Sequence, residues 1–180
     1  MVSRGALAGV LLALTAPAGG QGTADRPTEY HVMAAFLYNF AKFVQWPEAT
    51  DAAEHPFVIT VLGQDPFGNV LDDTLQGKAV DGRMVTLRRV SSAEGVEPSQ
   101  ILFISDSEQQ QLPAILDSIG TKAILTVGEM GDFSERGGVI RFDVEDDRVR
   151  LEINVDAAER SGLRISSDLL RIARVVREGS

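Results

Sequence analysis

Three short runs of aliphatic and β-branched residues constrain the fold of this chain more than any other feature of the sequence. They are Phe57–Leu62, Gln100–Ser105 and Ala123–Val127, and a helical pattern at Pro113–Ile119 separates the last two. A continuous apolar run of this length is typical of a strand buried on both faces of a sheet. Strands that alternate with helices favour parallel pairing. We therefore predict an α/β fold: a three-layer sandwich, Rossmann-like, with a mostly parallel central sheet flanked by helices.

Further elements extend this sheet. Arg83–Val90 alternates and predicts another strand, and a helix is expected from Asp65, as its cap, through Leu75. Val139–Val144 and Arg148–Ile153 alternate around three acidic residues, which indicates an antiparallel hairpin at the sheet edge. Two C-terminal helices are expected. The first is Val155–Ser161. The second is capped by Ser166 or Ser167, and its apolar stripe consists of Leu169, Leu170, Ile172, Ala173 and Val176.

The first helix is predicted from Glu29 to Trp46, with Thr28 as its cap and Pro47 as its stop. Its apolar stripe is formed by Met33, Phe36, Leu37, Phe40, Ala41 and Val44. Four aromatic residues fall partly off that stripe, namely Tyr30, Tyr38, Phe43 and Trp46. A helix that is apolar around much of its circumference is either covered on several sides or docks on another molecule.

The first residues have the pattern of an export signal. Arg4 is a short basic region, Ala6–Thr15 is apolar, and Ala16–Ala18 is a small-residue cleavage pattern. We expect residues 1–18 to be a signal peptide, 19–28 a flexible lead-in and 29–178 a single α/β domain that works outside the cytoplasm. A retained anchor or a misassigned start codon are the alternatives. No later segment resembles a membrane-spanning helix, so direct membrane insertion is not expected.

Charge and composition exclude several classes of function. The chain has 17 basic and 26 acidic residues, and loss of residues 1–18 would leave 16 against 26, a net charge of −10. Nucleic-acid binding and attraction to anionic lipid both need clustered cations, so neither is expected. There is no cysteine, which excludes disulfides, zinc–thiolate sites and thiol nucleophiles.

No pattern in the sequence indicates catalysis. The two histidines, His31 and His55, have no metal-ligand spacing, and no G-x-S-x-G elbow marks a nucleophilic serine for a secreted hydrolase. Gly63–Gly68 follows a strand as a phosphate loop would, but Asn69 stands where the lysine is needed. A tight turn is the simpler interpretation, with a small ligand at the carboxyl ends of the strands as the alternative. The acidic hairpin turn does not match a calcium loop. We expect no enzyme activity, cofactor or metal.

Two groups of residues are candidates for binding a partner or a ligand. Glu152, Arg160 and Arg164 place charges around a compact turn after the hairpin, and arginine binds carboxylates in a bidentate manner. The alternative for Arg160 is a favourable position at a helix C-terminus. The second group is aromatic, because such side chains dominate interface energetics. It comprises Tyr38, Phe43 and Trp46, whereas Phe36 and Phe40 are expected in the core.

Several stretches together give the chain a family resemblance. They are Ala34–Pro47, Ile101–Ser105 and Ile124–Glu129, followed by Glu152–Asn154, Ala157–Ala158 and Gly162–Ser167. With these motifs in this order, the sequence from about Tyr30 to Val176 resembles the YfiR/HmsC-like family of periplasmic proteins. Relatives often carry a cysteine where this chain has Ser99. Control through thiol oxidation is therefore not available to it.

The resemblance implies a repressor and not an enzyme. Such proteins bind the periplasmic domain of an inner-membrane diguanylate cyclase and keep cyclic di-GMP and biofilm matrix low. In some systems an outer-membrane OmpA-like lipoprotein captures the repressor, and other relatives accompany sensor histidine kinases. The alternative from another class is a periplasmic small-molecule-binding module that serves a sensor kinase or transporter. A homodimer is the default expectation for a chain of this size.

Overall fold

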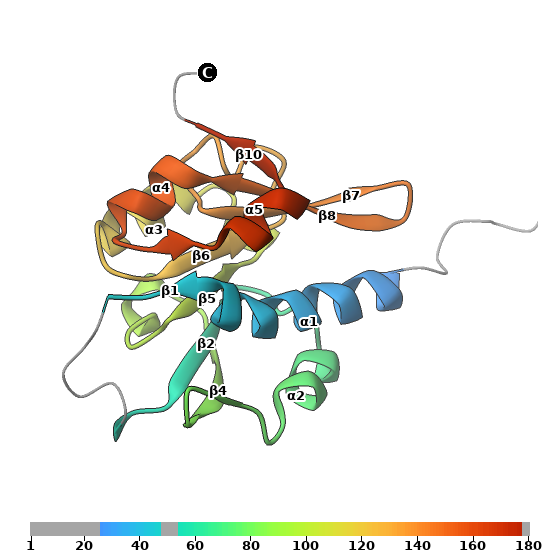
Figure 1. The fold of residues 1–180 in the computed structure, drawn as a ribbon, viewed down its shortest axis with the longest axis vertical. Coiled ribbons are helices and arrows are strands. Elements are labelled where there is room, and N and C mark those ends of the chain that lie inside the picture. The colour runs from blue at the N-terminus through green and yellow to red at the C-terminus, as the bar shows by residue number, and fades with distance from the viewer. Residues whose placement is uncertain (1–25, 48–53, 178–180) are drawn as a thin grey trace, which may run out of the picture.

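The computed structural model describes residues 26–47 and 54–177 (Figure 1). The predicted signal peptide, residues 1–18, lies outside the described residues, as do residues 19–25 of the predicted lead-in. Residues 26–28 already belong to helix α1 (Arg26–Phe43), so Thr28 lies inside the helix and does not cap it. None of the helices in the described ranges combines the length and the apolar composition that a bilayer crossing requires.

A sheet of eight strands forms the centre of the molecule, in the order β10-β8-β7-β6-β5-β2-β4-β3. Five neighbouring strands, from β4 through β2, β5 and β6 to β7, are parallel to one another. β8 and β3 are antiparallel additions at either end, and β10 pairs parallel with β8. The strand bounds are β2 (Phe57–Leu62), β3 (Ala79–Val80), β4 (Arg83–Val90), β5 (Ile101–Ile104), β6 (Leu125–Gly128), β7 (Ile140–Glu145), β8 (Arg148–Asn154) and β10 (Arg174–Val176).

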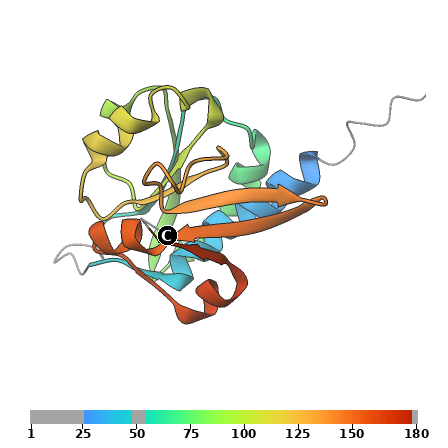
Figure 2. The same ribbon diagram turned by 90° about the horizontal axis from the view of Figure 1, so that it is seen from above.

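Helices cover both faces of this sheet, as Figure 2 shows from above. One face carries α1, α2 (Asn69–Leu75), α4 (Val155–Arg160) and α5 (Ser167–Ile172), and the other carries α3 (Leu112–Ile119). Two short 3₁₀ turns, Ala93–Gly95 and Asp106–Glu108, lie in the connections. A second sheet of two strands pairs β1 (Val44–Gln45) with β9 (Arg164–Ile165). The predicted α/β sandwich with a mostly parallel sheet and an edge hairpin is confirmed.

The core consists of two layers, and strand β5 contributes to both. Ile101 and Phe103 pack with α1, whereas Leu102 and Ile104 pack with α3. Successive side chains of a strand point to opposite faces. All four are fully buried because each face of the sheet is covered by a helix. This arrangement is the physical reason that the central strands read as unbroken apolar runs.

The structure corrects three predicted boundaries. α1 ends at Phe43, three residues before Trp46, because Val44 and Gln45 pair with β9 instead of continuing the helix. α2 begins at Asn69, since the Asp65 carboxylate accepts the N–H of Phe67 in a local turn and does not cap the helix. The last helix ends at Ile172, and Val176 lies in β10. These differences arise from tertiary pairing and turn chemistry, which helical periodicity does not report.

Candidate docking surface

Helix α1 presents an apolar groove on the side that its buried stripe leaves uncovered. Met33, Leu37 and Phe40 face the sheet and are completely or almost completely buried. The flank beside them is open, and a groove of about 390 Å³ follows it. Its lining is His31, Val32, Ala35, Phe36 and Asn39. Val32 is apolar, yet 40% of its surface is exposed.

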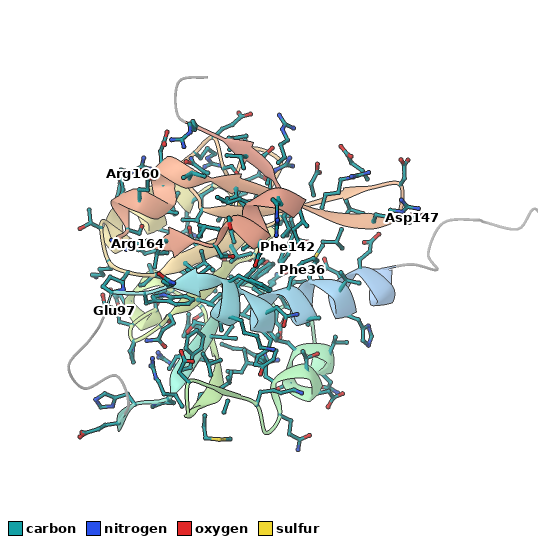
Figure 3. The ribbon with its side chains drawn as sticks, in the orientation of Figure 1. Phe36, Glu97, Phe142, Asp147, Arg160 and Arg164 are labelled. Carbon is teal, nitrogen blue, oxygen red and sulfur yellow. The ribbon has the colours of Figure 1, made fainter. Side chains whose placement is uncertain are left out.

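A cluster of aromatic rings holds the β7–β8 hairpin beside this groove. Phe142 of β7 lies between Phe40 and Phe36, with ring centroids 5.9 Å and 6.2 Å away, respectively. Figure 3 shows Phe36 and Phe142 side by side where α1 meets the base of the hairpin. Both ribbon views show the hairpin extending along the N-terminal half of α1 (Figures 1 and 2). The cluster therefore holds the hairpin firmly against α1, because aromatic pairs at these distances attract each other beyond their area of contact.

The hairpin adds an exposed apolar residue and an acidic tip. Val144 is 42% exposed. It comes two residues after Phe142 on β7, so both side chains lie on the face of the strand that is turned toward α1. The turn residues Asp146 and Asp147 both have positive φ, as a two-residue hairpin turn requires. Glu145 is paired with Arg150 across the hairpin at 2.9 Å. The tip is thus a solvated turn that presents carboxylates, with Asp147 at its outer end (Figure 3).

The three aromatic residues predicted as binding candidates do not line the groove. The Tyr38 hydroxyl donates to the carbonyl of Ala79 at 3.3 Å, on the other flank of α1. Phe43 is exposed at the C-terminal end of α1. The Trp46 indole N–H donates to the carbonyl of Gln100 at 3.2 Å, and its ring packs edge-on against Phe57. Trp46 and Tyr38 thus fasten α1 and β1 to the amino-terminal end of the sheet.

The three predicted charged residues are also separated. Glu152 is buried on β8, where its carboxylate accepts from the Arg141 guanidinium at 3.1 Å and lies 3.4 Å from that of Arg174. The pKa of Arg141 is raised: burial opposes this shift, but the bonds to Glu152 and the nearby Asp143 outweigh it. Arg160 and Arg164 are both exposed and lie together at the opposite end of the molecule from the hairpin tip (Figure 3).

The crevice at the carboxyl ends of β2 and β5, where open α/β sheets bind ligands, is partly filled by side chains. Strand order changes direction between these two strands. The Ser107 hydroxyl accepts the N–H of Gln64 at 3.0 Å and donates to Glu108 at 2.9 Å. A Cβ built on Gly63 would lie 2.4 Å from the Ser107 oxygen. Partial burial at the same end raises the pKa of Asp106. The two strand ends are therefore closed against each other.

Histidine and acidic side chains form no candidate metal site within the described ranges. In residues 26–47 and 54–177, no group of three or more histidine or acidic side chains is placed to hold a metal ion. His31 lies on the rim of the apolar groove, and His55 is exposed just before β2. The arrangement can bind another molecule through apolar contact.

Sequence reasoning missed Val32, Ala35 and Val144 as surface residues, although a signal for the first two was present. The first helix is apolar around much of its circumference, which is what a helix with a second exposed apolar flank shows. Val144 carried no signal of its own, because an alternating strand does not show which residues extend beyond the core.

Two comparisons with known proteins bear on the chain. A family model described as YfiR/HmsC-like matches residues 30–174. Among solved structures, one described as the ABC domain in complex with L-Trp from Streptococcus pneumonia is similar, with a TM-score of 0.52 and 11% sequence identity. The similarity covers 84% of this chain and 60% of that one, so this chain spans less than two thirds of that structure's length. At this identity the likeness concerns the fold alone.

Proposed function

The chain belongs to the YfiR/HmsC-like family, and on this premise we propose that it binds the periplasmic part of an inner-membrane signalling protein and holds that protein inactive. The family supports a periplasmic regulator of diguanylate cyclase in general. The partner we propose is a diguanylate cyclase, so that the bound state lowers cyclic di-GMP and biofilm formation. In this proposal the mature chain is exported and cleaved after residue 18.

The observation that carries the proposal is the apolar groove on α1. Exposed apolar surface rimmed by polar groups is typical of protein-binding sites. Here Val32 and Phe36 provide apolar surface, and His31 and Asn39 provide polar groups. The contact of Phe36 with Phe142 holds the hairpin against this helix. These features support docking of a partner segment that has an apolar centre.

Repression requires only that the chain bind one receptor state more tightly than the other. To move a two-state receptor from almost fully active to almost fully inactive, the difference in affinity has to reach about 10⁴-fold, or about 5.5 kcal/mol. A preformed groove suits this task, because a rigid surface is complementary to one arrangement of the partner. Release then needs a competitor for the same surface, and an OmpA-like outer-membrane lipoprotein would fill that role.

The releasing signal cannot be thiol oxidation in this chain, since it has no cysteine. Ser99, where relatives often have cysteine, is buried, and its oxygen lies 2.6 Å from the Thr60 hydroxyl. This contact fastens the segment before β5 to strand β2 without a covalent bond. We therefore place the switch in competition between partners.

A pull-down from membranes, with the mature chain as bait, tests the proposal directly. We expect a membrane-bound diguanylate cyclase to co-purify, and deletion of the gene to raise cyclic di-GMP. Unchanged cyclic di-GMP together with no co-purifying membrane protein would refute the proposal. Recovery of a sensor histidine kinase instead would keep the regulatory role and replace the partner. Cell fractionation of the tagged chain tests export to the periplasm.

A thermal-shift screen separates this proposal from that of a small-molecule-binding module. A ligand that binds only the folded state raises the melting temperature. At a concentration of one hundred times its dissociation constant, it stabilises the fold by about 2.7 kcal/mol. We expect no shift with amino acids or small anions, because Ser107 and Glu108 close the crevice beside Gly63. A saturable shift with one of these compounds would favour the module.

A further inference from the structure

Strand β4 is an edge strand along most of its length. Val85–Val90 pair with β2 on one side. On the other side, β3 pairs only with Arg83 and Met84. Beyond Met84, no strand within residues 26–47 and 54–177 covers this side of β4. Figure 1 shows β4 and α2 together at the lower end of the molecule.

The backbone groups of Leu87 and Arg89 point away from the sheet. The carbonyl of Val90 accepts from the N–H of Gly63 at 3.0 Å, so Val90 faces β2. The N–H of Val85 donates to the carbonyl of Lys78 at 2.9 Å, on the outer side. Because backbone groups alternate along a strand, Leu87 and Arg89 face outward as Val85 does. An edge of this kind is a template for another strand.

The two arginines that would guard this edge are bound to the chain itself. The Arg88 guanidinium donates to the carbonyls of Gly95 at 2.9 Å and Glu97 at 3.0 Å. Arg89 donates to the carboxylates of Asp65 and Asp72, both at 2.6 Å. Charged side chains that extend into solvent are a common protection against edge pairing. On β4 these two side chains are held back, and the edge remains accessible.

A pocket of about 350 Å³ lies next to the open edge, between β4 and the C-terminal end of α2. Its lining is Asp72, Asp73, Leu75, Gln76, Gly77, Val85 and Leu87. The apolar residues form one part and the two carboxylates another. Asp73 is exposed, and Asp72 already forms a salt bridge with Arg89. The pocket thus suits an aliphatic side chain that is followed by a basic one.

We propose that the β4 edge between Val85 and Arg89 binds an extended, basic segment of a partner protein as an added strand, in line with β3. Main-chain hydrogen bonds to Leu87 and Arg89 supply the affinity, and alternate side chains enter the pocket. Charge selects this occupant over a second copy of the chain. Each copy has a net charge of −9, so two copies repel each other, whereas a basic segment is attracted. This surface is distinct from the α1 groove, and the proposal does not depend on the identity of the repressed partner.

Fluorescence anisotropy with a labelled peptide that alternates lysine and valine tests the proposal. We expect saturable binding. The same peptide with N-methyl groups on the edge that faces β4 should bind roughly tenfold more weakly, since it loses two or more hydrogen bonds. A peptide with glutamate in place of lysine should lose affinity to a similar extent, because it meets Asp72 and Asp73. Equal binding of the methylated peptide, or no binding of the parent peptide, would overturn the proposal.

Two protein variants locate the binding on β4. Leu87→Pro removes an N–H that points outward and leaves the ladder to β2 intact, so affinity for the lysine–valine peptide should fall roughly tenfold. Asp73→Lys should weaken binding to a similar degree without changing the melting temperature. Asp117→Lys, an exposed change on α3, is the matched control and should bind as the parent does. Parent-like affinity in Asp73→Lys, or a dimer that dissociates on Leu87→Pro, would overturn the proposal.

Discussion

The ring of Phe142 on strand β7 packs 6.2 Å from the ring of Phe36 on helix α1, centroid to centroid, and the two planes are tilted by 46°. This contact joins the base of the hairpin to the flank of α1 that carries the groove. Phe142 is buried, whereas Phe36 is only half-buried and extends into the groove lining. One aromatic pair therefore belongs both to the core and to the proposed docking surface.

Val32→Glu should weaken binding to the membrane partner without destabilising the fold. Val32 is exposed in the free chain, and a surface substitution of this kind changes stability by less than about 0.5 kcal/mol. Placing a charge within an apolar interface should reduce affinity roughly tenfold or more. Affinity can be measured by pull-down or interferometry with the partner's periplasmic domain, and stability by thermal melting.

Met84→Glu is the matched control for this experiment. Met84 is another exposed apolar residue, at 56%. It lies on β4, which is separated by β6, β5 and β2 from the hairpin strand β7 beside the groove. Its replacement should leave partner affinity unchanged. Equal loss of affinity in both variants, or none in either, would show that the α1 groove is not the docking surface.

Glu152→Ala should destabilise the protein strongly, because it leaves the buried guanidinium of Arg141 without its main partner. The side chains of Glu152 and Arg141 are only 8% and 11% exposed, and breaking a buried pair from one side costs about 3 kcal/mol. Arg174→Ala, which removes an exposed partner of the same carboxylate, should cost less than about 1 kcal/mol. Urea unfolding at neutral pH measures both. Equal costs would mean that Glu152 contributes to the surface and not to the core.

The central strands could be predicted because local sequence and tertiary environment agree there. Phe57–Leu62 reads as a buried strand, and all six residues are buried. The three-residue strand β10 could not be predicted in this way, since Arg174–Val176 is a strand only through its pairing with β8. Likewise, α1 gives up Val44 and Gln45 to β9, a partner more than one hundred residues away in the chain. Periodicity carries no information about such distant pairing.

The pairing of Glu152 with Arg141 was open to prediction from the hairpin turn. A two-residue turn at Asp146 and Asp147 places Glu145 opposite Arg148, and continuing the same register along the strands places Arg141 opposite Glu152. Opposite charges at directly facing positions predict an ion pair. What the sequence could not supply was Arg174, which reaches the same carboxylate from β10.

Stability should fall in acid partly through Asp72. The hydrogen bond from Arg89, helped by its charge, lowers the pKa of Asp72 below its ordinary value of 3.8, although slight burial opposes the shift. Between the folded-state pKa and 3.8, the unfolded chain binds more protons than the folded one. The pair therefore stabilises the fold above pH 3.8, and this contribution is lost as the pH falls through the folded-state pKa.

Asp72→Asn tests this assignment. Because Asp72 and Arg89 are both largely solvent-accessible, the contribution should be below about 1 kcal/mol at neutral pH. The variant should be less stable than the parent at neutral pH, and the difference should vanish at the acid end of a series of urea titrations. A difference between the two proteins that stays constant with pH would show that Asp72 acts through packing and not through its charge.

Gly63→Ala should destabilise the fold more than Gly77→Ala, and the comparison isolates the contact that closes the crevice between β2 and β5. Both glycines have positive φ, at 91° and 66°, so each alanine incurs a backbone cost of about 1 kcal/mol. At Gly77 the new methyl group meets nothing within 4 Å. At Gly63 it would lie 2.4 Å from the Ser107 oxygen and displace the hydrogen bond to Gln64, which adds about 1–2 kcal/mol.

Addition of Ser107→Gly to Gly63→Ala should therefore recover part of the loss, with a coupling of about 1 kcal/mol in a double-mutant cycle measured by urea unfolding. Strictly additive costs would mean that Ser107 does not close the crevice, and ligand screening of the double variant would then start from an open site.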